Sequence, residues 1–140
     1  MPQLEQLLGQ YPKELKLVFK NYPLPGHPFA MKAATQAMAA DSQGKFWEFH
    51  DLLFNNYNKL GDQKLAEIAK QLGLEEQEFA KKVADPLIAE KIQGDITDGN
   101  KVELEGTPTI FINGKLVRDW SPEGFRKAVD KELMKARGKR

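Results

Sequence analysis

Few residues of this chain could serve as an acid, a base, a nucleophile or a metal ligand. Its 140 residues include no cysteine and two histidines, His27 and His50. Without a thiol, the chain itself offers no thiolate nucleophile, no disulfide and no cysteine-ligated metal. No carboxylate cluster accompanies the two histidines at ligand spacing, so we interpret His27 as a loop residue and His50 as part of a helix. We therefore expect no catalytic residue, no metal site and no cofactor.

Two further features could support chemistry of another kind. Glu103 and Glu105 form a closely spaced carboxylate pair, which is the arrangement that general acid–base catalysis uses, and we interpret them as part of a solvated loop. Trp120 offers an aromatic surface, and we interpret it as packing under the last helix. An enzyme of a chemistry other than thiol exchange is thus poorly supported by the residues.

The most informative stretch is residues 106–118. Two runs rich in β-branched and aromatic residues flank Asn113-Gly114, the pair that most readily takes the positive φ angles of a type I′ turn. The pattern predicts an antiparallel hairpin whose register the two-residue turn sets. Its two faces are expected to carry Ile110 with Ile112 and Thr109 with Phe111.

A proline stands at the start of this hairpin. Pro108 cannot donate a ladder hydrogen bond, so we expect it at the first residue of the strand. The bond between Thr107 and Pro108 is the best candidate in the chain for a cis peptide, although only about 5% of X-Pro bonds in folded proteins are cis.

Hydrophobic periodicity predicts helices for most of the remaining chain. Asp85-Pro86 and Ser121-Pro122 are helix start signals, a capping residue followed by proline. The expected helices cover residues 2–10, 29–40, 46–57, 62–72, a short stretch around 79–83, 86–102, and the chain from 122 onward. Alternation predicts one further strand over residues 15–20. The aromatic-rich helix is expected to bury one stripe: Phe46, Phe49, His50, Leu53, Phe54 and Tyr57.

Composition excludes several classes of partner. Lys and Arg number 21 against 20 Asp and Glu, a net charge of +1, so no overall field attracts nucleic acid or anionic lipid. No apolar run approaches membrane-spanning length, and the first residues do not open a signal peptide. We expect neither a nucleic-acid nor a membrane partner. The lack of cysteine is compatible with any compartment.

Residues 105–115 resemble the cis-proline segment of the thioredoxin superfamily, in the DsbA-like branch of thiol:disulfide oxidoreductases. Residues 17–28 resemble that family's second strand and its exit, and residues 30–34 and 44–54 resemble its inserted helical domain. The resemblance implies an α/β, thioredoxin-like fold of the DsbA type. Residues 1–28 and 103–140 would form the thioredoxin-like part, and residues 29–102 the inserted helical subdomain. Family members are mostly periplasmic or extracytoplasmic.

The resemblance also implies a binding site. In the family, the cis-proline loop lies beside the redox Cys-x-x-Cys and holds an extended substrate peptide through its backbone. The matching residues here are Gly106, Thr107 and Pro108. The implied partner is an extended or unfolded polypeptide.

The N-terminus departs from the family pattern. In the family a strand and Cys-x-x-Cys precede the first helix, whereas this chain begins inside that helix, with no Ser or Thr at the matching place. We therefore expect the first strand to be missing and the chain to be redox-inactive. The missing strand would lie between the strands at 15–20 and 109–111. We predict that these two strands pair directly, or that a second subunit covers the gap in a homo-oligomer.

Two functional interpretations stay open. One is a truncated or mis-started member of the disulfide oxidoreductase family, which retains the substrate-side residues without the nucleophile. The other is a non-catalytic peptide-binding or chaperone-like module that captures polypeptide by β-augmentation along the cis-proline strand.

Overall fold

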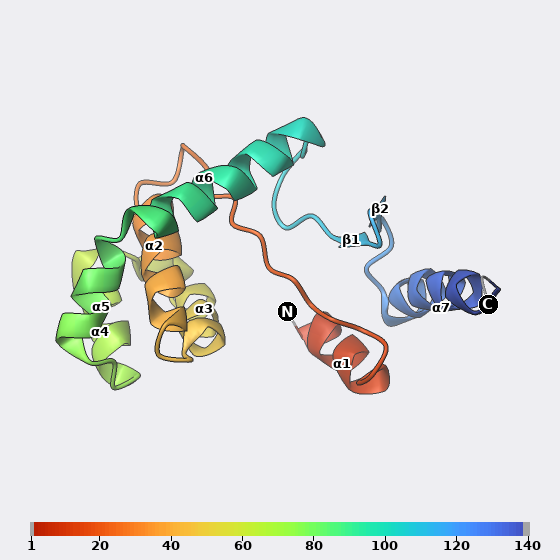
Figure 1. Ribbon diagram of the computed structural model, residues 1–140, viewed down its shortest axis with the longest axis horizontal. Helices are drawn as coiled ribbons and strands as arrows, with labels where there is room; N and C mark the ends of the chain where they lie inside the picture. The colour runs from red at the N-terminus through yellow and green to blue at the C-terminus, as the bar shows by residue number, and fades with distance from the viewer. Residues whose placement is uncertain (1, 139–140) are drawn as a thin grey trace. The chain divides into compact units, whose positions relative to one another are not determined.

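The computed structural model describes residues 2–138, which form seven α-helices, one 3₁₀ turn and a two-stranded sheet. The order along the chain is α1 (Pro2–Gln10), α2 (Ala30–Asp41), α3 (Phe46–Asn55), the 3₁₀ turn η1 (Tyr57–Lys59), α4 (Asp62–Gln71), α5 (Glu76–Val83), α6 (Pro86–Lys101), β1 (Phe111–Ile112), β2 (Lys115–Leu116) and α7 (Pro122–Gly138) (Figure 1). The chain divides into two compact units. The first comprises the chain up to Phe19 and from Leu104 onward, and the second is Lys20–Glu103.

The hairpin of the first unit matches the prediction. β1 and β2 are antiparallel, and Phe111 lies opposite Leu116. Asn113 and Gly114 have φ angles of 49° and 80°, as a type I′ turn requires. One face of β1 packs against the core through Ile110 and Ile112, while Phe111 on the other face is 41% exposed.

The core of the first unit lies between α1, the hairpin and α7. Its buried residues are Leu7, Val117, Phe125 and Val129. The predicted start of α7 is confirmed, because the Ser121 hydroxyl accepts a hydrogen bond of 3.0 Å from the Gly124 N–H. This cap fixes where α7 begins and thereby places Phe125 and Val129 beneath the hairpin.

The strand expected over residues 15–20 is not formed. The sheet contains β1 and β2 only, among residues 2–138, so direct pairing of residues 15–20 with β1 is wrong as well. The segment leaves α1 through a hydrogen bond of 3.1 Å from the Leu15 N–H to the Tyr11 carbonyl and then runs as an open trace (Figure 1). A strand needs hydrogen bonds to a neighbouring strand, and no strand among residues 2–138 pairs with this segment.

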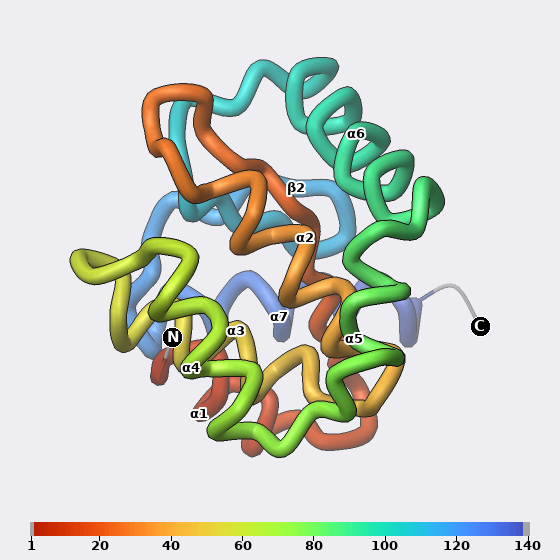
Figure 2. The backbone as a smooth tube through the Cα atoms, turned by 90° about the vertical axis from the view of Figure 1, so that its left-hand side faces the viewer, coloured from red at the N-terminus to blue at the C-terminus, as the bar shows by residue number. Residues whose placement is uncertain are grey.

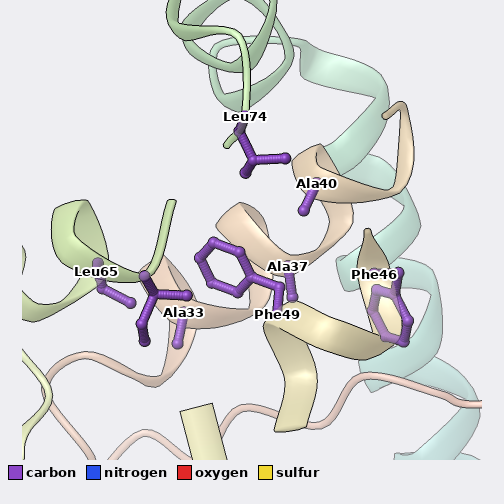
Figure 3. Packing of buried hydrophobic residues seen from close by; sticks show 8 residues of the cluster. Ala33, Ala37, Ala40, Phe46, Phe49, Leu65 and Leu74 are labelled. Atoms are coloured by element: carbon purple, nitrogen blue, oxygen red, sulfur yellow. The ribbon is translucent and has the colours of Figure 1, made fainter. Parts of the chain in front are cut away.

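The second unit is a helical cluster centred on α2. This helix contacts α3, α4, α5 and α6 (Figure 2). Its small residues allow close approach, and Figure 3 shows Phe49 of α3 lying beside Ala33 and Ala37 of α2. The predicted start of α6 is confirmed, since the Asp85 carboxylate accepts a hydrogen bond of 2.9 Å from the Leu87 N–H. No described helix has the length and apolar character needed to cross a bilayer.

The expected buried stripe of α3 is partly wrong. Phe46 and Phe49 are buried as predicted, but Phe54 and Tyr57 are 64% and 76% exposed. The helix ends at Asn55, two residues earlier than expected, so Tyr57 no longer continues its face. Leu53 packs against the core as predicted, and Leu52, which the predicted stripe does not include, packs there as well.

Candidate functional site

The loop Gly106-Thr107-Pro108 lies directly before β1 in the first unit. All three residues are exposed, and the peptide bond between Thr107 and Pro108 is cis. The loop is closed by a hydrogen bond from the Thr109 hydroxyl to the Gly106 carbonyl. A Cβ at Gly106 would meet no atom within 4 Å, so the approach to the loop is open at this point.

The main chain of Thr107 has its hydrogen-bonding groups available. Neither its N–H nor its carbonyl makes a hydrogen bond within the described chain, and Pro108 has no N–H to offer. Exposed main-chain groups are satisfied by water until another chain replaces it. The loop can therefore accept the backbone of an extended peptide.

The open edge continues from the loop along β1. The Val117 N–H donates to the Ile110 carbonyl at 2.9 Å, and Ile112 opposes Lys115 next to the two-residue turn. Bonded and non-bonded pairs alternate along an antiparallel ladder. Phe111, which lies between these two bonded pairs, consequently directs its N–H and carbonyl away from β2. No strand lies on that side among residues 2–138.

Beside this edge lies a cavity of about 70 Å³. It is bounded by α1, by residues 15–17, by residues 110–112 and by one residue of α7. Lys16 is the one charged residue among those that line it. The lining residues are Leu4, Leu7, Leu8, Leu15, Lys16, Leu17, Ile110, Phe111, Ile112 and Phe125. Sequence reasoning placed these segments in one part of the fold but did not identify the cavity.

A larger cavity of about 300 Å³ lies between β2 and α7. The Glu132 carboxylate at its rim is 3.2 Å from the ammonium of Lys115 and 3.2 Å from that of Lys135. The hydrogen bond from Lys115, and after it the one from Lys135, holds the pKa of the Glu132 carboxylate below its usual value. No sequence pattern indicates this cluster, because Lys115 and Glu132 are 17 positions apart and lie on different elements.

The two histidines are not brought into a metal or catalytic site. His27 is exposed in the proline-rich loop of the second unit, and its main-chain N–H donates to the Leu24 carbonyl at 3.1 Å. His50 lies on α3, with Nδ1 3.2 Å from an Asp51 carboxylate oxygen and its ring 4.7 Å from that of Phe54. No group of three His, Asp or Glu residues in the described part of the chain is arranged to hold a metal ion.

The remaining candidates lie on the surface or support the fold. Glu103 and Glu105 are both exposed. The Trp120 indole N–H donates to the Val117 carbonyl at 2.9 Å, and the side chain is 37% exposed. This bond ties the tryptophan to the end of the hairpin, while its packing under the last helix stays a prediction.

Comparison with known proteins gives one family and several relatives. The family profile that matches residues 2–131 is described as Thioredoxin. The chain is 36% identical over 115 residues to the Na(+)/H(+) antiporter NhaA 3 of Salinispora tropica, covering 81% of this chain and 18% of that protein. It is 28% identical over 130 residues to a probable disulfide bond formation protein D of Bacillus anthracis, covering 87% of this chain and 59% of that protein.

A solved structure shares the fold. The thiol-disulfide exchange protein alpha-DsbA2 of Wolbachia pipientis superposes with a TM-score of 0.80 at 24% identity, over 93% of this chain and 71% of that one. The fold expected from the sequence, α/β and thioredoxin-like of the DsbA type, is thus confirmed. The chain spans less than two thirds of the length of both curated relatives.

Proposed function

Because the chain belongs to the thioredoxin superfamily, in its DsbA-like branch, we propose that it binds extended polypeptide segments through the loop Gly106-Thr107-Pro108 without exchanging disulfides. The observation that carries the proposal is the unpaired, exposed main chain of Thr107 beside the cis bond to Pro108. An extended peptide pairing there would meet the open edge of β1 next. Affinity would come from main-chain hydrogen bonds.

Thiol chemistry is not part of the proposal. The Bacillus anthracis relative is named a probable disulfide bond formation protein, and disulfide exchange requires a thiolate that attacks a disulfide sulfur. These 140 residues contain no cysteine. In an assay that follows reduction of a disulfide-bonded protein, the chain should give the rate of the buffer alone. Turnover above that rate would contradict the chemical argument.

Binding is tested by nuclear magnetic resonance with an unfolded, apolar peptide as the probe. Addition of peptide should shift the amide signals of residues 105–110 and leave those of α7 beyond Val129 unchanged. Absence of any shift in residues 105–110 at millimolar peptide would reject the proposed function.

Two substitutions at one position separate main-chain from side-chain recognition. Thr107→Ala keeps the main-chain N–H and should change the dissociation constant by less than a factor of three. Thr107→Pro removes that N–H and should weaken binding at least tenfold. Equal effects of the two substitutions would contradict recognition through the backbone. The melting temperature of each variant reports whether the fold is retained.

A further inference from the structure

We infer that an extended peptide enters the first unit as an inserted strand, with the open edge of β1 on one side and residues 16–18 on the other. The inference rests on the proposed function, because the edge of β1 directly follows the loop at Pro108. It adds residues 16–18 to the binding site as a second wall, and it specifies which side chains the bound peptide should carry. A peptide held by the loop and β1 alone would be an edge strand, whereas an inserted peptide pairs on both sides.

Both walls carry main-chain groups without partners. On the β1 side, Phe111 directs its N–H and carbonyl away from β2, as the ladder alternation requires. On the other side, the main chains of Lys16, Leu17 and Val18 make no hydrogen bond with any described residue. Unpaired main-chain N–H and carbonyl groups on both segments can form ladder hydrogen bonds with a polypeptide strand that lies between them.

The two walls belong to one apolar cavity. Residues 15–17 and 110–112 line the same space, which α1 and Phe125 of α7 close on the core side. Apolar side chains remain exposed on both walls: Leu17 is 39% exposed, Val18 63% and Phe111 41%. A strand between these segments would remove that surface from water, which favours insertion.

The cavity also defines the side chains of the ligand. Its volume of about 70 Å³ and its mostly apolar lining favour small aliphatic groups. Alternate residues of a strand point to one face. Lys16 has no ion-pair partner within residues 2–138. The ligand is therefore an extended peptide with valine or alanine at every second position and an acidic residue that reaches Lys16.

The first test locates the peptide. The probe is a peptide of alternating valine and serine that ends in glutamate, and the readout is the amide spectrum of the full chain. Insertion shifts the signals of residues 16–18 together with those of 105–111 and protects their amides from hydrogen exchange. Shifts at 105–111 alone would overturn insertion and leave the proposed function standing. Shifts at neither segment would overturn both.

The second test uses the peptide backbone. Successive N–H groups of a strand point to opposite edges, so N-methylation of the odd residues blocks one edge and N-methylation of the even residues blocks the other. An inserted strand needs both edges, and each methylated peptide should bind at least tenfold more weakly than the parent. A peptide bound as an edge strand needs only one of its two hydrogen-bonding edges, so only one of the two methylated peptides should lose affinity. Loss of affinity with one methylated peptide and not with the other would overturn insertion.

The third test fills the cavity. Leu17→Trp places an indole in the cavity that Leu17 lines, and it should weaken peptide binding at least tenfold. Met134→Trp is the control, because Met134 of α7 is 71% exposed and does not line the cavity; the dissociation constant of this variant should stay within threefold of the parent value. Equal effects would overturn the assignment. Melting temperatures of both variants establish that they fold.

A second copy of the chain is the rival occupant. Sedimentation equilibrium of the chain at the concentration used for the spectra distinguishes the two. A monomer that binds the peptide in a one-to-one ratio supports insertion of a peptide. A dimer that the peptide does not dissociate, with residues 16–18 already protected from exchange, would overturn it.

Discussion

Asn21 and Asp95 are joined by two hydrogen bonds inside the second unit. The main-chain N–H and the side-chain amide of Asn21 both donate to Asp95 Oδ2, each at 2.9 Å. The other carboxylate oxygen accepts from Lys91 Nζ at 2.6 Å. Asn21 and Asp95 are each 3% exposed, so the carboxylate ties the first residues of the unit to the middle of α6. No buried side-chain nitrogen or oxygen in the described chain lacks a hydrogen-bond partner.

Removing the carboxylate should destabilise the second unit. Asp95→Ala leaves two buried donors of Asn21 unpaired, and each unmet buried group costs about 1–3 kcal/mol. We expect a loss of at least about 2 kcal/mol in the free energy of unfolding, measured by urea denaturation. The control is Asp98→Ala on the same helix, which removes an ion pair with Lys20 in which both side chains are 55% exposed. An equal loss for both variants would contradict a special role for the buried carboxylate.

The same carboxylate should make stability depend on pH. Burial raises the pKa of Asp95, but the hydrogen bonds from Asn21 and Lys91 outweigh burial and hold the pKa below its usual value. Because the pKa of Asp95 is lowered in the folded state, the carboxylate contributes its full stabilisation above the pKa of an unfolded Asp, about 3.9. This stabilisation is lost as the pH falls through the pKa of the folded state. Between pH 5 and 2, unfolding free energy should fall more steeply for the parent chain than for Asp95→Asn. Parallel curves for the two would contradict this account.

Two aromatic residues of α3 should differ sharply in their contribution to stability. Phe49 is fully buried among Ala33, Ala37 and Leu65, so Phe49→Ala should cost about 3–5 kcal/mol through lost burial and the cavity left behind. Phe54, five residues later on the same helix, is 64% exposed, and Phe54→Ala should change stability by about 0.5 kcal/mol or less. Calorimetric melting of the two variants measures the difference. A large cost for Phe54→Ala would show that its exposed side chain is covered in solution.

Signals carried by a few adjacent residues were sufficient for much of the fold. Asn113-Gly114 specifies its turn because positive φ angles are required there. Asp85-Pro86 and Ser121-Pro122 specify helix starts because the cap and the proline each satisfy a local requirement. The loop Gly106-Thr107-Pro108 was likewise found from adjacent residues, through their resemblance to a family segment.

Features that depend on a distant partner were not predicted. Residues 15–20 alternate as a strand does, but the alternation cannot supply the neighbour that a strand needs. Tyr57 has helical spacing, but the helix ends at Asn55. Phe54 lies inside the helix and still faces solvent, whereas Leu52 and Leu53 pack against the core. The contact between Asn21 and Asp95 joins residues 74 positions apart, and periodicity carries no information about such a pair.

Gly124 should be intolerant of any side chain. A Cβ at this position would lie 2.5 Å from the Asp119 carbonyl oxygen, closer than real Cβ contacts allow. Gly124→Ala should therefore force the segment 119–124 to move, at a cost of roughly 1–3 kcal/mol, and should lower the melting temperature. Gly94 in α6 is the control, because a Cβ there meets nothing within 4 Å. Gly94→Ala should stabilise by about 0.4–1 kcal/mol, since alanine restricts the unfolded chain and favours the helix. If both substitutions stabilise, the close approach of Asp119 to the start of α7 does not hold in solution.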